Sequence, residues 1–258
     1  MGRFDGVLIA SDWDGTLAVK GKIPEENIKA IRYFQENGGK FTICSGRYFK
    51  YLMDFRDVVR VNTYTIAYNG AYIIDTDSGE CLYEGFCDEY LFDILKELLS
   101  RGLHYKTIAF YDNENPVPYE LTVSDFLTDM DAHRGKKLYK VLLRSDTPEH
   151  AKEGVTVANS LELRDYIAVR SWEISLEILK RENAKGAAIR RVADKIGARL
   201  VVGIGDYEND ITLLDEADIG YAVEDAIPEL LPYATRRTVS AAEGAVAAVI
   251  YELDKELS

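Results

Sequence analysis

Hydrophobic and polar positions follow two different patterns near the start of the chain. Residues 6–11 and 40–45 are short apolar runs of the kind that form buried strands. Residues 25–39 instead space their apolar positions three and four apart, so that Ile28 and Ile31 fall on one helix face, and two glycines end the pattern. The pattern therefore predicts a strand, a helix and a second strand in succession.

The same alternation returns near the end of the chain. Residues 184–198 and 242–253 follow helical patterns, and residues 199–206 and 219–223 are apolar runs. Strands that alternate with helices are typical of parallel strands joined by crossover helices. We therefore expect both ends of the chain to contribute to one parallel α/β sheet.

The middle of the chain has a different pattern. A helical segment is followed by strand-like runs at residues 105–112 and 137–145, a second helical segment and two further strand-like runs. This mixture is typical of an α+β domain. We predict a discontinuous core domain, residues 1–83 and 181–258, with a second domain, residues 84–180, inserted into it.

Composition narrows the classes of function. The chain has 258 residues, 47% of them hydrophobic, and a formal net charge of −13, which argues against a protein that binds nucleic acid through a basic surface. No run of 18 apolar residues is present, so we expect no membrane span. The three cysteines form no CxxC pair, which favours a reduced, cytoplasmic protein. We expect a monomer or a homodimer.

Polar residues follow the apolar runs at the points where the predicted strands end. Functional groups in an open parallel sheet gather beyond the carboxyl ends of the strands, so these residues should share one crevice. They are Asp12 and Asp14 after the first run, Ser45, Gly46 and Arg47 after the second, Lys185 at a helix start, and Asp206, Asn209 and Asp210 after a late strand.

Carboxylates that converge in this way need a cation. Two like charges 4 Å apart repel each other by about 4 kcal/mol at a surface-like dielectric constant. Oxygen ligands without a nearby histidine favour Mg²⁺ over Zn²⁺ or copper. All histidines lie in the inserted region, where we expect surface or packing roles for them: His104, His133 and His150.

Such a site suits phosphoryl transfer from a small phosphorylated molecule. One carboxylate near Mg²⁺ can attack phosphorus, and a second carboxylate two positions on can protonate the leaving alcohol and later deprotonate water. Lys185 and the Ser45 hydroxyl, with backbone N–H groups from the Gly15 and Gly46 turns, would hold the phosphoryl oxygens. Each residue type then has a chemical role.

Simpler interpretations exist for single residues. Asp12 and Asp14 precede a glycine and fit an ordinary turn. Arg47 fits a surface salt bridge as well as it fits a phosphate contact. Asn69 and Gly70 first indicate a tight hairpin turn, and a substrate contact at Asn69 is the second interpretation. The combination of these residues at strand ends favours the active-site interpretation over the turn at Asp12.

Four segments in this order resemble the motifs of the haloacid dehalogenase superfamily: DWDGT at 12–16, CSGR at 44–47, NAKG at 183–186 and GDYEND at 205–210. The insertion lies between the second and third motifs, which resembles the Cof-like sugar-phosphate phosphatases of subclass IIB with an α/β cap of the C2 type. YNGAYI at 68–73 is also similar to that subgroup. The resemblance implies an α/β fold, with a Rossmann-like parallel-sheet core and an inserted α+β cap domain.

The resemblance also implies roles for individual residues. Asp12 would be the nucleophile and Asp14 the general acid/base, while Ser45 would hydrogen-bond the phosphoryl group and Lys185 would balance its charge. Trp13 and Tyr207 depart from the smaller residues common at those positions of the family. The predicted substrate contacts are Gly46, Arg47, Asn69 and Asn209. The implied Mg²⁺ ligands are Asp12, the backbone carbonyl of Asp14 and Asp206, while Asn209 and Asp210 would complete the metal shell directly or through water.

The expected function is a Mg²⁺-dependent phosphatase that hydrolyses small phosphomonoesters, sugar phosphates above all, through a phosphoaspartyl intermediate. The alternatives are a phosphomutase of the same superfamily and a non-catalytic protein that binds phosphorylated metabolites as a regulator. A nucleoside phosphate also stays open as the substrate. The presence of both Asp12 and Asp14 favours an enzyme, because a binding protein does not need the acid/base carboxylate.

Overall fold

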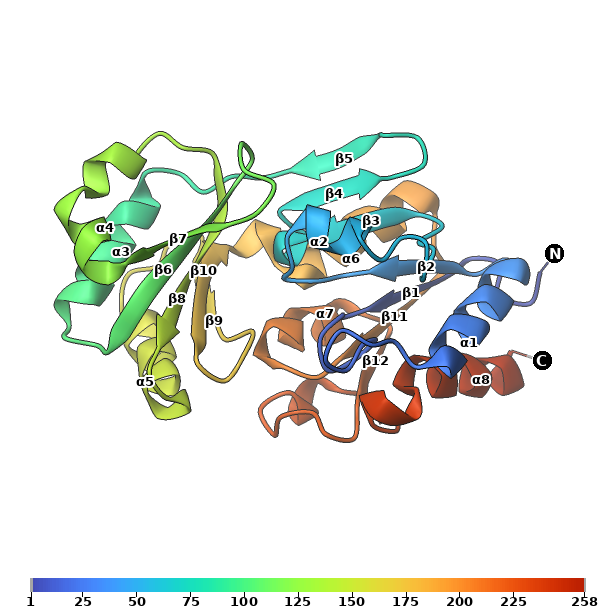
Figure 1. Ribbon diagram of the computed structural model, residues 1–258. Coiled ribbons are helices and arrows are strands. Elements are labelled where there is room, and N and C mark those ends of the chain that lie inside the picture. The colour runs from blue at the N-terminus through green and yellow to red at the C-terminus, as the bar shows by residue number, and fades with distance from the viewer. Residues whose placement is uncertain (1, 258) are drawn as a thin grey trace.

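Two bodies of secondary structure lie side by side in the computed structural model, which describes residues 2–257 (Figure 1). One body contains both ends of the chain, and the other contains the middle of the chain (Figure 1). Two connections join them, from β5 (Cys81–Glu84) to α3 (Tyr90–Ser100) and from β10 (Ser175–Lys180) to α6 (Lys185–Ile196). This arrangement confirms an α/β core with an inserted cap, while the exact boundaries at residues 84 and 180 stay a prediction.

The core is built on a five-stranded parallel sheet in the order β13-β12-β11-β1-β2. Strand β1 lies between β2 and β11, and Val7 pairs with Leu200. The two ends of the chain therefore form one sheet, as predicted. The strands are β1 (Val7–Ser11), β2 (Lys40–Ile43), β11 (Leu200–Gly205), β12 (Ile219–Ala222) and β13 (Arg236–Arg237).

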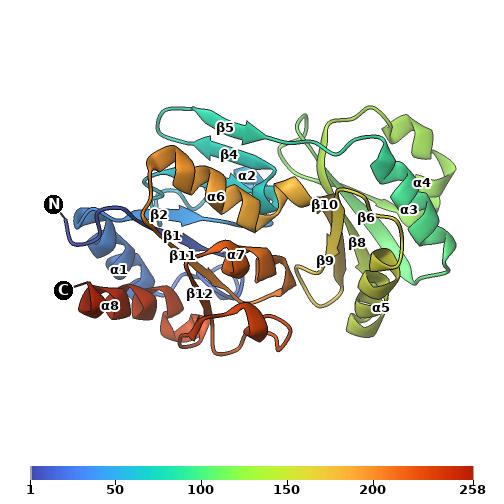
Figure 2. The same ribbon diagram turned by 180° about the vertical axis from the view of Figure 1, so that it is seen from behind.

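Helices cover both faces of this sheet (Figure 2). Val7 and Ile9 of β1 pack in one apolar cluster with α1 and α8, whereas Leu8 and Ala10 pack in another with α6 and α7. Full burial of a large apolar side chain stabilises the fold by about 1.5–3 kcal/mol, which explains why β1 is apolar at nearly every position. The core helices are α1 (Glu25–Glu36), α2 (Phe49–Met53), α6 (Lys185–Ile196), α7 (Ile211–Glu216) and α8 (Ala245–Glu256).

A three-stranded antiparallel sheet extends the core beside β2. It consists of β3 (Tyr64–Ala67), β4 (Tyr72–Asp75) and β5, and a parallel bridge from Cys44 to Ile66 joins it to the end of β2. The turn between β3 and β4 places Asn69 at φ +64°, a conformation that asparagine tolerates better than most residues. The predicted hairpin is confirmed, and β5 is a strand that the sequence pattern did not reveal.

The cap is a five-stranded antiparallel sheet in the order β7-β6-β8-β10-β9, with α3, α4 and α5 on its outer face (Figure 1). Val141 and Leu143 of β8 pack against those helices, while Leu142 and Arg144 face a cavity on the other side. The remaining cap elements are β6 (Tyr105–Asp112), β7 (Tyr119–Thr122), α4 (Val123–Thr128), β8 (Leu138–Ser145), α5 (Pro148–Asn159) and β9 (Tyr166–Val169).

The structure also bears on the expectations for the histidines, the cysteines and a membrane span. The histidines have packing contacts: His104 stacks on His150 at 4.6 Å and His133 on Phe110 at 5.2 Å between ring centroids. The cysteines are unpaired in the part of the chain that the structure describes, and Cys81 is exposed. No helix among residues 2–257 is long and apolar enough to cross a membrane.

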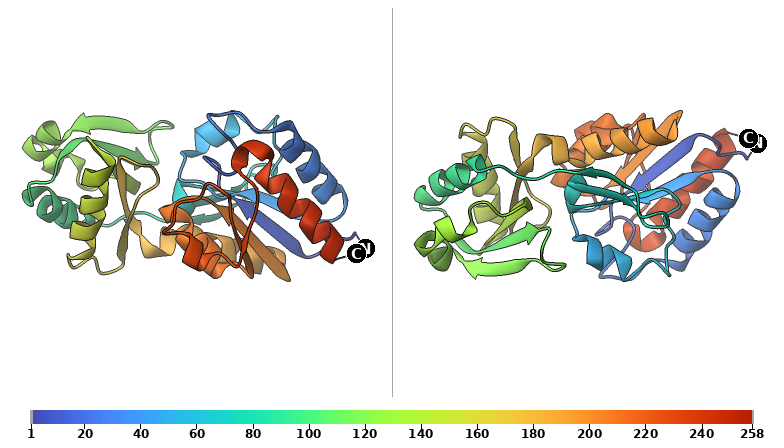
Figure 3. Two further views of the ribbon diagram at one scale, coloured as in Figure 1. Left: turned by 90° about the horizontal axis from the view of Figure 1, so that it is seen from below. Right: turned by 90° about the horizontal axis from the view of Figure 1, so that it is seen from above.

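Both termini lie together at the end of the core that points away from the cap (Figure 3).

Candidate active site

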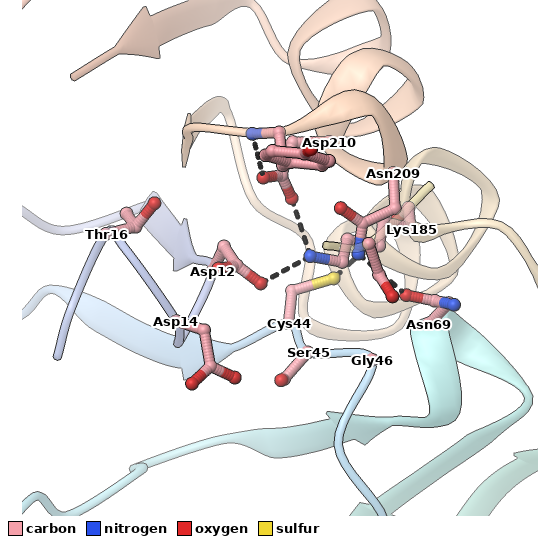
Figure 4. Close-up of polar contacts among 12 residues, drawn as sticks. Asp12, Asp14, Thr16, Cys44, Ser45, Gly46, Asn69, Lys185, Asn209 and Asp210 are labelled. Atoms are coloured by element: carbon pink, nitrogen blue, oxygen red, sulfur yellow. Dashed lines mark hydrogen bonds and ion pairs between the residues drawn. The ribbon is translucent and has the colours of Figure 1, made fainter. Parts of the chain in front are cut away.

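The carboxyl ends of β1, β2 and β11 bring most of the predicted residues together (Figure 4). Asp12 directly follows β1, and its backbone N–H donates to the carbonyl of Ile204 at 2.9 Å, so the chain stays in the sheet up to this residue. Its side chain is only 8% exposed. Asp12 therefore presents a buried carboxylate at the centre of the sheet edge.

Lys185 lies between two carboxylates (Figure 4). It opens α6, its side chain is completely buried, and its Nζ donates to Asp12 Oδ1 and, at 2.6 Å, to Asp210 Oδ1. The other oxygen of Asp210 accepts the backbone N–H groups of Asp206 and Tyr207 at 3.0 and 3.1 Å. Asp210 therefore both pairs with the lysine and fixes the loop after β11.

Asp206 is held by the turn that follows Asp12. The hydroxyl of Thr16 donates to Asp206 Oδ1 at 2.9 Å. Gly15 has φ +79°, and a Cβ at this position would lie 2.8 Å from Asp206 Cγ. Only glycine therefore allows the turn and the carboxylate to approach so closely.

These residues fit a hard divalent cation. Asp12, Asp206 and Asp210 each offer an oxygen, and the three oxygens lie within 4.8 Å of one another. Two charged carboxylates at that distance repel by about 3–4 kcal/mol at an effective dielectric constant of about 20, and Lys185 supplies a single positive charge against three negative ones. All donors in the set are carboxylate oxygens, which suits Mg²⁺.

Burial and the neighbouring charges shift the pKa values of these groups. Burial raises the pKa of Asp12 to about 7 despite the opposing effect of Lys185, with Asp210 and Asp14 adding to the rise. Burial, followed by the charges of Asp12 and Asp210, also raises the pKa of Asp206 well above its usual value. Burial alone would lower the pKa of Lys185, but the two carboxylates that it contacts raise it instead.

Asp14 points away from this cluster (Figure 4). Its two oxygens accept from Arg47 Nε and Nη2 at 2.7 and 2.9 Å, in a pair whose side chains are nearly half exposed. Such a surface pair contributes less than about 1 kcal/mol, so an incoming phosphate can replace it. The surface salt bridge of Arg47 is thus present, and its contact with phosphate stays a prediction, as does the metal contact of the Asp14 backbone carbonyl.

Two cap residues that the sequence analysis missed, Lys140 and Glu177, support the loop after β2. Lys140 of β8 donates to the carbonyl of Gly46 at 2.8 Å, and Glu177 of β10 accepts from both Lys140 and Asn69. Asn69 in turn accepts from Asn209 at 3.2 Å, and it is not among the residues that line the cavity. Lys140 and Glu177 each interrupt an apolar strand pattern, and this could have revealed them, because a buried charge needs a partner.

A cavity of about 600 Å³ lies between core and cap above these residues. Tyr207 lines it, together with Tyr111 and Trp172 of the cap, and Trp172 is 54% exposed. Trp13 is fully buried and packs on Phe55 at 4.7 Å between ring centroids, so its side chain does not shape this cavity. The residues that line its core side are Asp12, Asp14, Gly15, Lys20, Ser45, Gly46, Arg47, Tyr48, Asp206, Tyr207 and Asn209.

Comparison with known proteins agrees with the fold. The family model described as haloacid dehalogenase-like hydrolase matches residues 9–250. The chain is 32% identical over 267 residues to the "Putative phosphatase YxeH" of Bacillus subtilis, covering 95% of this chain and 97% of that protein. It is 29% identical over 297 residues to the "5-amino-6-(5-phospho-D-ribitylamino)uracil phosphatase YwtE" of Bacillus subtilis, covering 97% and 98% of the two chains.

Solved structures show the same architecture. A haloacid dehalogenase-like hydrolase from B. subtilis superimposes with a TM-score of 0.79 at 25% identity, covering 95% of this chain and 99% of that chain. A subclass IIB sugar phosphatase, BT4131, has the same fold with a TM-score of 0.77 at 19% identity, covering 97% of this chain and 99% of that one. The chain belongs to the haloacid dehalogenase superfamily, in its Cof-like family. Within that family it is a phosphatase.

Proposed function

We propose that this phosphatase is Mg²⁺-dependent and hydrolyses small phosphomonoesters, sugar phosphates above all, through a phosphoaspartyl intermediate on Asp12. The observation that carries the proposal is the buried Asp12 carboxylate, bonded to Lys185 and lying at the base of a cavity beside Asp206 and Asp210. We further propose that residues 1–83 and 181–258 form the catalytic core and residues 84–180 the cap.

In the first step, the Asp12 carboxylate attacks phosphorus while the bond between phosphorus and the leaving oxygen breaks. The electron pair of that bond goes to the leaving oxygen, which takes a proton from Asp14 as the free alcohol. Asp14 accepts from Arg47 as a carboxylate, so it must first leave this pair and take up a proton from solvent before it can donate one, and Arg47 is then available to the phosphoryl oxygens. Ser45, whose side chain lies at the same edge of the cavity, would donate its hydroxyl to the phosphoryl group.

In the second step, water attacks the phosphorus of the phosphoaspartyl group. Asp14 takes the water's proton, Asp12 leaves as a carboxylate, and inorganic phosphate is released, so both residues return to their starting states. Lys185 stays bonded to Asp12 and Asp210 throughout and neutralises part of the negative charge. Mg²⁺, held by Asp12, Asp206 and Asp210, would supply the positive charge that the site otherwise lacks.

The size and lining of the cavity support a sugar phosphate as substrate. A volume of about 600 Å³ is in the usual range for a pocket that encloses a small organic molecule. On the cap side, Ser171 and Ser175 offer hydroxyl groups and Tyr111 and Trp172 offer aromatic faces. Hydroxyl and aromatic groups together suit a ligand with both polar edges and apolar faces, as sugars have.

Hydrolysis of p-nitrophenyl phosphate tests the proposal, with purified protein assayed in Mg²⁺ and in EDTA beside Asp12→Asn. We expect turnover that EDTA abolishes and that Asp12→Asn lowers at least a thousandfold, because the amide cannot act as nucleophile. A panel of sugar phosphates and nucleoside monophosphates then identifies the substrate class. Full activity of Asp12→Asn would contradict the nucleophile assignment, and full activity in EDTA would contradict the metal requirement.

A further inference from the structure

A buried ion pair of the cap reaches into the phosphate-binding loop of the core. Lys140 and Glu177 lie on neighbouring strands of the cap sheet, on the face opposite its helices. Their side chains are 1% and 2% exposed, and the Nζ–Oε1 distance is 2.8 Å. The Lys140 ammonium donates a second hydrogen bond to the Gly46 carbonyl, also at 2.8 Å. The pair therefore belongs to the cap but contacts the backbone of the core.

Glu177 ties together further segments of the site. Its Oε1 accepts from Ser171, in the cap loop that carries Trp172, at 2.6 Å. Its Oε2 accepts from Asn69, whose own oxygen accepts from Asn209 in the loop after β11. One carboxylate thus links the cap loop to the turn of Asn69 and, through Asn69, to the loop after β11 that borders the cavity.

A contribution to stability alone does not explain why the cap contains the buried Lys140–Glu177 pair. Taking two charges out of water costs several kcal/mol per ion, and apolar residues of similar volume often stabilise a protein equally well. Burial accordingly lowers the pKa of Lys140, although Glu177 opposes the shift. What apolar residues cannot supply is a donor aimed at a backbone carbonyl.

The bond to Gly46 sets the orientation of a peptide group at the site. In a trans peptide the C=O of one residue and the N–H of the next point in opposite directions, and no cis peptide occurs in the described chain. With the Gly46 carbonyl held by Lys140, the Arg47 N–H points the other way and donates to Ser45 Oγ at 3.1 Å. A Cβ on Gly46 would lie 2.9 Å from Asn69 Oδ1, so a side chain there would displace Asn69.

We propose that Lys140, held in place by Glu177, is a positioning residue that couples the cap to the phosphoryl-binding loop. The loop is aligned for the phosphoryl group only while the cap is docked on the core. The ammonium orients the Gly46–Arg47 peptide, whose N–H donates to Ser45 Oγ and so orients the Ser45 hydroxyl for the phosphoryl oxygens. This inference rests on the proposed function, because that function assigns the Ser45 hydroxyl to phosphate binding. A cap that has moved away withdraws Lys140, and the loop then loses its alignment for phosphate.

The test compares phosphate binding in variants that remove the contact between Lys140 and the Gly46 carbonyl. The double variant Lys140→Met/Glu177→Leu replaces both charges by apolar groups of similar volume. Lys140→Gln is a milder second variant, because its amide can still donate to Glu177 but is too short to reach Gly46 as well. The control is Lys152→Met, which removes an exposed ion pair between cap and core, Lys152 to Glu229 at 3.3 Å, and neither of these residues lines the cavity.

Inorganic phosphate is titrated calorimetrically in Mg²⁺, and KM and kcat are measured with p-nitrophenyl phosphate. We expect the double variant and Lys140→Gln to bind phosphate at least tenfold more weakly with a raised KM, while Lys152→Met and wild type agree within twofold. Lys140→Arg, which keeps a cation with several donors, should recover part of the affinity. A merely structural role would lower the active fraction, and therefore kcat, at unchanged KM.

The outcomes separate this inference from the proposed function. Wild-type phosphate affinity in whichever of the two variants folds, or a fall in kcat alone, would overturn the positioning role. Wild-type protein that binds phosphate but hydrolyses no phosphomonoester would instead overturn the proposed function, because the calorimetric comparison does not depend on turnover.

Discussion

Replacing Gly15 by alanine tests whether the turn after β1 exists to admit the Asp206 carboxylate. Gly15 has φ +79°, and an added Cβ would lie 2.8 Å from Asp206 Cγ. Gly79, in the turn between β4 and β5, has almost the same conformation at φ +77°, but a Cβ there meets nothing within 4 Å. The two glycines therefore form a matched pair, with equal backbone strain and a clash at only one of them.

The contacts of Asp206 determine how much more stability Gly15→Ala should lose than Gly79→Ala. Alanine in the left-handed region costs about 1–2 kcal/mol, and both variants should lose that amount. At Gly15, Asp206 must also move, which breaks its hydrogen bond from Thr16 Oγ1 at 2.9 Å. A hydrogen bond to a charged group contributes about 1.5–3 kcal/mol. We therefore expect the free energy of unfolding to fall by about 1–2 kcal/mol in Gly79→Ala and by about 2.5–5 kcal/mol in Gly15→Ala.

Urea denaturation in EDTA, followed by circular dichroism, measures these losses, and calorimetric titration measures Mg²⁺ binding. Displacement of Asp206, a proposed metal ligand, should weaken Mg²⁺ affinity in Gly15→Ala by at least tenfold, since disturbing the support of a ligand typically costs 10–100-fold. Gly79→Ala should bind Mg²⁺ like the wild type. Equal losses of stability in the two variants, or unchanged Mg²⁺ affinity in Gly15→Ala, would refute the reasoning.

Three further predictions address single side chains. Lys185→Met should lower the free energy of unfolding by about 3–5 kcal/mol in urea denaturation, because Asp12 and Asp210 lose their shared cation; a loss below 1 kcal/mol would contradict this. Arg47→Met should change stability by less than about 1 kcal/mol yet raise KM for p-nitrophenyl phosphate severalfold, and an unchanged KM would leave Arg47 with only its surface pair. Burial lowers the pKa of His133, and the positive charge of Lys136 adds to this shift. The folded state therefore binds fewer protons than the unfolded chain, and the free energy of unfolding falls as the pH drops below about 6.5. Between pH 7.5 and 5 the melting temperature of wild type should therefore fall further than that of His133→Phe, and parallel curves would exclude this contribution.

Much of the core could be predicted because its physical causes are local in the sequence. Apolar runs alternating with helical patterns indicate a parallel sheet, and in such a sheet the residues after each strand meet at one edge. This rule alone placed Asp12, Ser45 and Asp206 near one another, and Lys185 followed from its place at a helix start. Their roles in catalysis stay a prediction until they are tested by substitution.

The cap and its contacts were harder to predict because they depend on pairing between distant strands. Strand β7 and helix α4 lie in a stretch whose polar composition concealed them. Lys140 and Glu177 each interrupt an apolar strand pattern, but their sequence spacing does not show that they pair across β8 and β10 or that one of them reaches Gly46. Only the three-dimensional arrangement shows which buried charges find partners.

The central position of β1 has a consequence for the order in which the protein is made. On the ribosome, β1 can pair with β2 early, but its other edge stays open until β11 emerges, because Val7 pairs with Leu200. Synthesis at about 5–20 residues per second separates these two strands by roughly 10–40 s. Throughout that interval an apolar strand edge is exposed to other nascent chains, while the cap strands, whose partners lie nearer in sequence, emerge in between. We therefore expect Asp12 and Asp206 to meet only in the last stage of translation, and chains that stop before residue 200 to be both inactive and prone to aggregate.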